Sequence, residues 1–352
     1  MWHVFSAATI AFLWISCHIP AAASGAVVGR FGIVTDVHYA DIDAGGTRHY
    51  RDSLPKMRDA IATFTSFSED AALDFIVELG DLKDTAVDND VNATIGYLDA
   101  IESALASSGL PTYHVLGNHD VDILDQPTCV AHAQAQPANV AHGPALGAYS
   151  FGIGTGAYNW NATLSVPGPL HFVVLNGNFN EAAVPWAAID APGTDFSWTS
   201  PWVPPSQVEW LAQDLAAAAA RGQKAIVFVH YRLDGGPGMH QSGWVNTLTL
   251  KNALQVREVL ASSGIVLATF SGHDHAPKPP FTVGAGPMAP DLLMFTHSAM
   301  VEGPHATSKA YSVVTVYDNC TVAIDGFGNT TSLVHGATPG CSTMAAPDRE
   351  SL

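Results

Sequence analysis

The chain has 352 residues, of which 47% are hydrophobic and 13% charged, so it can build a hydrophobic core and is neither disordered nor collagen-like. Its length allows two small domains or one large domain. With 14 Lys and Arg against 32 Asp and Glu, the net charge of −18 argues against binding of nucleic acid polymers, which requires cations that neutralise phosphates. Any polyanionic ligand therefore needs a local positive centre.

The N-terminal segment predicts the compartment. Val4 to Ile15 is mostly apolar, and Ala21–Ala23 follows in the small-x-small pattern that signal peptidase accepts. We therefore expect residues 1–23 to be a signal peptide and the protein to be secreted or to lie in the lumen of the secretory pathway. An N-terminal membrane anchor is the alternative, but the apolar run is shorter than the ~20 residues that a span needs. No later stretch of the sequence predicts a stable membrane span.

Sequons and cysteines agree with secretion. Asn-x-Thr triplets, which mark glycosylation acceptors, begin at Asn92, Asn161, Asn319 and Asn329. Removal of the signal leaves Cys129, Cys320 and Cys341, an odd number that permits one internal disulfide at most. We favour Cys320 with Cys341, which would join the C-terminal tail, residues 336–352, to the last strand. Other pairings stay open, and we expect the rest of the tail to be flexible.

Strands alternate with helices along most of the chain. Short apolar runs, typical of buried strands, occur at Phe31–Thr35, Phe75–Leu79, Thr112–Leu116, His171–Leu175, Ala225–Val229 and Ile265–Phe270. Apolar residues at helical spacing predict helices at Leu54–Phe67, Ala93–Ser107, Ser206–Ala220 and Leu250–Ser262. Ser206 and Glu209 have the spacing of a capping box.

The C-terminal part changes to consecutive strands. Leu292–Thr296, Tyr311–Tyr317 and Thr321–Asp325 fit this pattern, with a hairpin turn at Asp318-Asn319. Two segments rich in Pro, Gly and Ala, Asp122–Gly147 and Asn178–Pro205, are predicted to be loops.

Polar residues typical of metal sites follow five of the predicted strands. They occur in Asp36-Val37-His38, Gly80-Asp81, Gly117-Asn118-His119-Asp120, at His230, and in Gly272-His273-Asp274-His275. Because the carboxyl ends of the strands in an α/β sheet meet along one edge, these side chains can lie together. Carboxylate, amide and imidazole ligands suit manganese, iron or zinc, and the absence of thiolates argues against a structural zinc site.

Each motif alone has a simpler interpretation: a turn, a structural histidine or a surface loop. In this order, each after a predicted strand, they favour a site for two divalent metal ions. Two such ions lower the pKa of a bridging water and neutralise charge that develops in an in-line displacement at phosphorus. They also supply the local positive charge that an acidic protein needs in order to bind a phosphate.

The ordered set D-x-H, GD, GNH(D/E), H and GHxH resembles the calcineurin-like metallophosphoesterase superfamily, over residues 31 to about 275. The resemblance implies a four-layer α/β/β/α sandwich of two mixed sheets flanked by helices, in one domain over residues 24–335. It implies that Asp36, His38 and His275 hold one metal, that Asn118, His230 and His273 hold the other, and that Asp81 bridges them. His119 would bind a phosphoryl oxygen, with Asp120 orienting its imidazole.

A narrower resemblance rests on other segments. Tyr39-Ala40-Asp41, the stretch from Gly45 to Leu54, Asp84 after the GD motif, and Glu302-Gly303 are similar to manganese-dependent ADP-ribose/CDP-alcohol diphosphatases. Vertebrate members carry Gln at the position of His38. Purple acid phosphatases fit less well, because they carry Tyr where this chain has Asp84. The resemblance implies two divalent ions and a small substrate with a nucleoside diphosphate linkage. The family indicates Mn²⁺, while the ligand types leave Fe and Zn open.

Four residues are candidates for substrate binding. Tyr39 could stack on a base or sugar, or be a packed core tyrosine. Arg48 and Arg51 could contact a distal phosphate, or form ion pairs with acidic neighbours such as Asp52. Tyr231 follows the candidate ligand His230 and could reach substrate. Two other functions stay open: a secreted phosphomonoesterase that scavenges phosphate, and a secreted binding protein without activity. The sequence leaves the oligomeric state undetermined.

Overall fold

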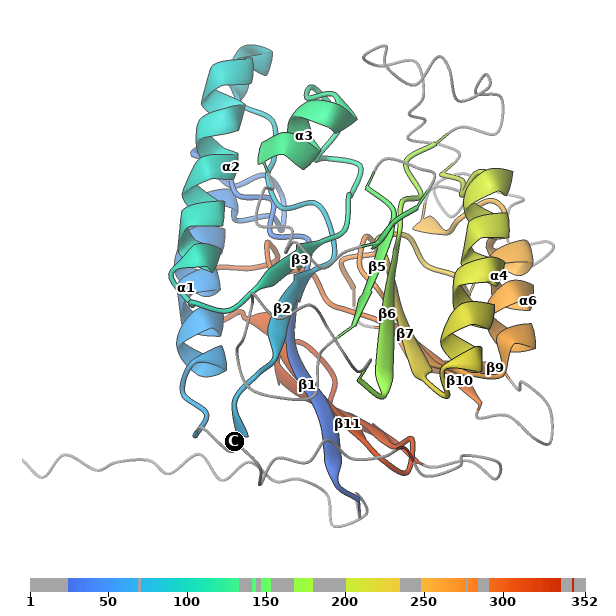
Figure 1. Ribbon diagram of the computed structural model, residues 1–352. Coiled ribbons are helices and arrows are strands. Elements are labelled where there is room, and N and C mark those ends of the chain that lie inside the picture. Colours follow the sequence, from blue (N-terminus) through green and yellow to red (C-terminus); the bar gives the residue numbers. More distant parts are fainter. Residues whose placement is uncertain are drawn as a thin grey trace, which may run out of the picture.

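Two β-sheets pack face to face, and helices cover the outer face of each (Figure 1). The computed structural model describes residues 25–68, 71–132, 141–143, 147–152, 168–179, 201–234, 248–276, 278–283, 291–336 and 344. The four-layer α/β/β/α arrangement predicted from the sequence is confirmed. No helix among these residues is long and apolar enough to span a bilayer. The predicted signal peptide, residues 1–23, lies outside the described residues, as does Asn161.

The first sheet has the strand order β13-β12-β11-β1-β2-β3. Its strands in chain order are β1 (Val27–Val34), β2 (Phe75–Glu78), β3 (Thr112–His114), β11 (Ala310–Tyr317), β12 (Val322–Gly328) and β13 (Leu333–His335). Strands β1, β2 and β3 are parallel, while β11, β12 and β13 continue the sheet as antiparallel strands on the other side of β1. The carboxyl ends of β1, β2 and β3 therefore lie on one edge.

The second sheet has the order β4-β5-β6-β7-β8-β10-β9. It comprises β4 (Ala141–His142), β5 (Tyr149–Gly152), β6 (Leu170–Leu175), β7 (Lys224–Val229), β8 (Val266–Ser271), β9 (Phe281–Val283) and β10 (Leu292–Thr296). The central strands β6, β7, β8 and β10 are parallel, and their six-, six-, six- and five-residue runs are nearly all buried, as expected for strands covered on both faces.

Helices α1 (Ser53–Phe64) and α2 (Val91–Ala106) cover the first sheet, and α4 (Pro205–Ala220) and α6 (Ala253–Ser263) cover the second (Figure 1). Asp90 caps α2 by accepting from the backbone N–H groups of Asn92 and Ala93, and Gly264 ends α6 in a left-handed conformation. Helix α3 (Gln126–His132) lies near the upper end of the sheets in Figure 1, and two 3₁₀ turns span Tyr50–Asp52 and Val87–Asn89.

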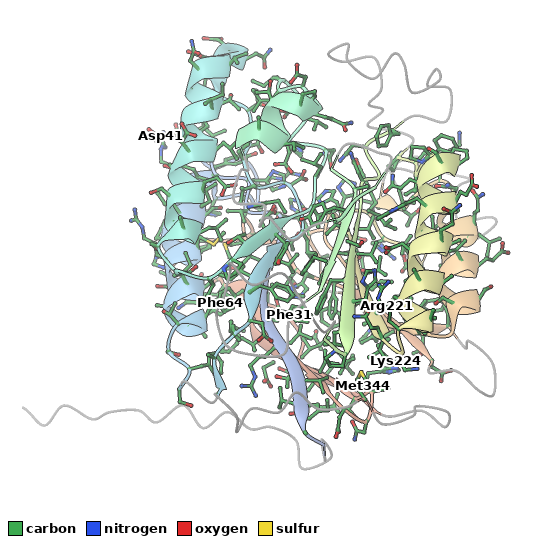
Figure 2. The ribbon with its side chains drawn as sticks, in the orientation of Figure 1. Phe31, Asp41, Phe64, Arg221, Lys224 and Met344 are labelled. Atoms are coloured by element: carbon green, nitrogen blue, oxygen red, sulfur yellow. The ribbon has the colours of Figure 1, made fainter. Side chains whose placement is uncertain are left out.

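The largest core cluster lies between the sheets and is rich in aromatic rings. Phe31 of β1 stacks on Phe75 of β2 at a centroid distance of 4.9 Å and meets Phe228 of the other sheet edge-on at 5.7 Å. Phe64 belongs to a different cluster, between α1 and the first sheet, and Figure 2 shows it on the α1 side of Phe31. Aromatic pairs in these geometries add about 0.5–1.5 kcal/mol each beyond their burial. The aromatic contacts fix how the two sheets face each other.

Several predictions of local structure are corrected. The segment Asp122–Gly147, predicted to be a loop, contains α3 and β4, and β9 and β13 are strands that the sequence did not predict. The capping box is wrong: α4 begins at Pro205, so Ser206 lies inside its first turn, and proline starts this helix. Residues 180–200 of the second predicted loop lie outside the described residues. The hairpin turn at Asp318-Asn319 joins the antiparallel strands β11 and β12, as predicted.

The chain reaches the intersheet core again near its C-terminus. Met344 is buried there (Figure 2), and its N–H donates to the carbonyl of Asp318. Cys320, beside this contact, is disulfide-bonded. Its predicted partner, Cys341, lies outside the described residues, and Cys129 is a buried free thiol. At Met344, therefore, the tail is attached to the domain.

Candidate metal centre

The ends of five strands from both sheets meet at one edge of the sandwich. Asp36 and His38 follow β1, Asp81 follows β2, Asn118 follows β3, His230 follows β7, and His273 and His275 follow β8. The structure brings these seven side chains together, in overlapping clusters whose ligand atoms lie within 4.8 Å of one another. All of them are buried or half-buried. Residues up to 239 positions apart in the chain thus form a single site.

Asp36, His38 and His275 form the first ligand group. The Nε2 atoms of His38 and His275 are 3.1 Å apart, and His275 Nε2 is 3.4 Å from Asp36 Oδ1. The other oxygen of Asp36, Oδ2, accepts from the hydroxyl of Thr35, and the backbone N–H of His273 donates to both carboxylate oxygens, at 2.9 Å to Oδ2 and 3.1 Å to Oδ1. These bonds fix the carboxylate so that Oδ1 faces the two imidazoles.

Asn118, His230 and His273 form the second ligand group. His230 Nε2 lies 3.2 Å from Asn118 Oδ1 and 3.1 Å from His273 Nδ1. Asp81 joins the two groups: its Oδ2 atom is 3.5 Å from His38 Nε2 and 3.2 Å from His230 Nε2. Its Oδ1 atom accepts from the backbone N–H of His119 at 2.7 Å. One oxygen of Asp81 therefore stands between the two ligand groups.

The chemistry of the donors fits metal cations. His38 Nδ1 is 3.1 Å from an Asp84 oxygen and His275 Nδ1 is 2.8 Å from a Glu302 oxygen, so the Nε2 atoms of the two rings are turned toward each other, 3.1 Å apart. Imidazole nitrogen and carboxylate oxygen are suitable ligands for borderline divalent metals, which these atoms would hold.

Three partners outside the ligand groups orient the imidazoles. They are Asp84 for His38, Glu302 for His275, and the carbonyl of Leu79, which accepts from His230 Nδ1 at 2.8 Å. Such partners fix the tautomer and direction of a metal-binding histidine. The sequence pointed to Asp84 and Glu302 only as parts of a resemblance, without a role, because nothing in their spacing shows which ring they reach.

The backbone is unusual at the ligand residues. Asp36, His38, Asp81, His273 and His275 all have positive φ, between 44° and 67°. Such conformations cost roughly 1–3 kcal/mol each for residues with a Cβ, and they gather at functional sites. Two glycines beside the ligands are required as well. Gly80 has φ +100°, and a Cβ on Gly272 would lie 2.1 Å from the Thr35 hydroxyl. The tight turns aim the ligand side chains at one point.

Burial and mutual attraction shift the pKa values across the site. Burial by itself would raise the pKa of Asp36 and Asp81, but the neighbouring imidazoles outweigh it and lower both. Burial would lower the pKa of His230 and His275, yet the carboxylates of Asp81 and Asp36 outweigh it and raise each to about 9. The carboxylates thus favour positive charge on the imidazole rings, and bound metal cations would supply positive charge at the same place.

His119 lies beside the first ligand group, with its ring centroid 4.5 Å from that of His38. Its Nδ1 atom is 3.6 Å from Asp84 and 3.5 Å from Asp122. Burial opposes protonation, but nearby Asp81, Asp122 and Asp84 raise the pKa of His119 to about 10. The charged form of this ring is therefore favoured near neutral pH.

The predicted role of Asp120 is corrected. Its carboxylate accepts from the backbone N–H groups of Asp81, Leu82 and Gly117 at 2.7–2.9 Å. It therefore ties the turn after β2 to the turn after β3, and Asp84 and Asp122 take the place beside the His119 ring. The Asp120 side chain is directed at these three backbone N–H groups and therefore away from the His119 ring.

The four candidate substrate residues differ in position. Tyr39 is half-buried, with its ring edge-on to Tyr97 at 5.9 Å. The Arg51 side chain pairs with Asp41 and Asp43, not with Asp52.

Arg48 is partly exposed, whereas Tyr231 is buried. The Arg48 side chain is 33% exposed and its guanidinium lies 3.9 Å from Asp84, at the rim of the first ligand group. Tyr231 is 1% exposed and its hydroxyl donates to Asn178. The predicted contact of Tyr231 with substrate is therefore wrong, since its ring is part of the core.

Known proteins are similar to this chain in sequence and in fold. The sequence profile of the calcineurin-like phosphoesterase family matches residues 29–277. The manganese-dependent ADP-ribose/CDP-alcohol diphosphatase of Oryza sativa subsp. japonica is 26% identical over 263 residues, 70% of this chain and 77% of that protein. The protein of the same description from Arabidopsis thaliana is 25% identical over 278 residues, 70% of this chain and 79% of its own. The crystal structure of a dimetal phosphatase from Danio rerio superposes with a TM-score of 0.68 at 21% identity, covering 89% of this chain and 100% of that one.

Proposed function

Since the chain belongs to the calcineurin-like phosphoesterase family, we propose that it hydrolyses the diphosphate linkage of small nucleoside diphosphate derivatives with two Mn²⁺ ions. One observation carries the two-ion part of this proposal. Asp81 Oδ2 lies 3.5 Å from His38 Nε2 and 3.2 Å from His230 Nε2, which suits a carboxylate shared by two cations.

Seven residues would hold the ions. In this proposal the first ligand group (Asp36, His38, His275) binds one cation, the second (Asn118, His230, His273) binds the other, and Asp81 contacts both. When bound, two such cations activate a water and neutralise the charge that develops on the phosphoryl oxygens. Fe or Zn could occupy the same donors, and the names of the relatives favour manganese.

The chain's own side chains supply the remaining contributions. Asp84 and Asp122 orient the His119 ring, so that in its protonated form it can donate to a phosphoryl oxygen or to the leaving oxygen. Arg48, at the rim, is the candidate for a distal phosphate, since its guanidinium faces the site and stays partly exposed. Tyr39, half-buried with its ring edge-on to Tyr97, is the aromatic candidate for a base or sugar. Arg51, already paired twice, is a weaker candidate.

The substrate class rests on the relatives' names and on the segments around Arg48 and Glu302 that resemble them. The competing proposal is a phosphomonoesterase, because the same ligands would serve a simple phosphate ester. To separate the two, ADP-ribose, CDP-choline and an arylphosphate are offered to the Mn²⁺-loaded protein at several pH values. We expect the two diphosphates to be hydrolysed well above the arylphosphate, and the reverse ranking would overturn the diphosphatase assignment. Asp81→Asn, assayed in parallel, shows that the rates come from this site.

Secretion is the second part of the proposal. The predicted signal peptide at residues 1–23, the disulfide at Cys320 and the exposed sequon residues Asn92 and Asn329 support it. Expression of the full chain in eukaryotic cells tests it. We expect protein in the medium that begins near Ser24 and loses mass on removal of N-glycans. An intact N-terminus and retention inside the cell would contradict the proposal.

A further inference from the structure

A buried network of amide side chains lies behind the second ligand group. It consists of Asn176 and Asn178, which follow β6, together with Gln126 of α3 and Gln207 of α4. Asn176, Asn178 and Gln207 have no exposed surface. Burying so many amides is costly unless each is hydrogen-bonded, and the bonds here connect them to one another and to the backbone. Such a network holds its members in one arrangement.

Asn178 connects two of the strand ends that carry the second ligand group. Its Nδ2 donates at 2.7 Å to the carbonyl of Leu116, two residues before Asn118. Its Oδ1 accepts at 2.7 Å from the hydroxyl of Tyr231, the residue after His230. A single side chain thus sets the spacing between the end of β3 and the end of β7.

Tyr231 extends this connection to the third ligand. Its ring meets that of His230 at a centroid distance of 5.1 Å and that of His273 at 4.7 Å, edge-on in both cases. The same orientation that lets its hydroxyl donate to Asn178 places the ring against these two imidazoles. The bond from Tyr231 to Asn178 therefore holds the ring in position.

The Asn178 amide is itself fixed. Its Nδ2 and its backbone N–H both donate to Asn176 Oδ1, at 3.0 and 2.9 Å, and its carbonyl accepts from Gln126 at 3.0 Å. The first ligand group has different supports, Asp84 and Glu302. The hydrogen bonds that orient the imidazoles of the first group therefore come from residues outside the Asn178 network, while the bond from the His273 N–H to Asp36 joins the two groups.

We propose that Asn178, acting through the Tyr231 hydroxyl and the Leu116 carbonyl, is a positioning residue for the second ligand group alone. This inference rests on the two-cation function proposed above. Removing a residue that orients metal ligands weakens metal affinity about 10- to 100-fold. Loss of the Tyr231 hydroxyl should therefore weaken the affinity for one of the two ions about tenfold and leave the affinity for the other unchanged.

Tyr231→Phe is the first test, because it removes one oxygen and keeps the ring. Metal-free protein is titrated with Mn²⁺ by equilibrium dialysis, and electron paramagnetic resonance distinguishes isolated Mn²⁺ from a coupled pair. We expect two ions in the wild type. In Tyr231→Phe we expect one unchanged affinity, one weakened about tenfold, and more isolated Mn²⁺ at partial loading. Asn178→Ala should give the same pattern with a larger loss.

Tyr311→Phe is the matched control. This buried tyrosine of β11 forms a hydrogen bond through its hydroxyl with Thr63 of α1 at 2.9 Å, and it packs in the core cluster between α1 and the first sheet. The substitution therefore removes the same hydroxyl oxygen at a position that does not contact the ligand groups. It should keep both affinities. If Tyr231→Phe weakened the affinity for both ions equally, or left both affinities unchanged, the inference would be overturned. A wild-type protein that binds fewer than two ions would overturn the proposed function instead.

Discussion

Glu302 offers a local test of how the first ligand group is built. Its Oε1 atom is 2.8 Å from His275 Nδ1, and the variants are Glu302→Ala and Glu302→Gln. The loop itself should survive both substitutions. Buried Lys56 donates to the backbone carbonyls of Met300, Glu302 and Gly303 at 2.6–3.1 Å, and these bonds do not need the Glu302 side chain. The changes therefore act on His275 rather than on the fold.

The size of the effect follows from this contact. Loss of a carboxylate that orients a metal-binding histidine weakens metal affinity by about 10- to 100-fold, equivalent to about 1.4–2.8 kcal/mol. Glutamine keeps an oxygen that can accept from Nδ1 but lacks the charge, so Glu302→Gln should weaken metal affinity by about tenfold. Alanine keeps no acceptor, so Glu302→Ala should weaken it by about 100-fold.

Isothermal titration of the metal-free proteins with Mn²⁺ at one pH measures the effect. Glu258→Gln, an exposed residue of α6, is the control for loss of a negative charge and should match the wild type. Wild-type affinity in Glu302→Ala, or equal weakening in Glu258→Gln, would refute the reasoning that the bond to His275 matters.

Three further outcomes are expected. Asp81→Asn should fold, by circular dichroism, but lose most Mn²⁺-dependent hydrolysis, and wild-type rates would contradict its place between the ions. His119→Ala should lower kcat while both ions stay bound, and loss of metal would mean that this ring is a ligand. Burial lowers the pKa of His297 to about 3, so between that value and about 6.5 the unfolded chain binds one more proton and stability falls as pH falls. Relative to a His297→Gln variant, the wild type should lose about 2 kcal/mol in urea unfolding between about pH 7.5 and 5, and parallel pH profiles would rule this out.

The sequence predicted most strands and the position of the ligands because both depend on short-range patterns. A buried parallel strand has a largely apolar run, and the residue types that follow it mark the ligands. Glycine precedes the ligands after β2, β3 and β8, whereas Asp36 after β1 and His230 after β7 are marked by residue type alone. Their convergence follows from the parallel topology of each sheet.

What the sequence did not predict depends on side-chain direction and tertiary contacts. Tyr231 is next to His230, but its ring is buried against the His230 and His273 imidazoles and leaves almost no surface for a substrate. Asp120 is next to His119, yet carboxylates from two other positions, Asp84 and Asp122, reach the ring. Spacing in the sequence cannot distinguish such neighbours, because the folded turns decide which side chain is near.

A crystal structure of the protein loaded with Mn²⁺, with an anomalous difference map, would test the central claim most directly. We expect two peaks on either side of the Asp81 carboxylate, one among Asp36, His38 and His275 and one among Asn118, His230 and His273. A single peak, or metal bound away from Asp81, would contradict the two-cation site.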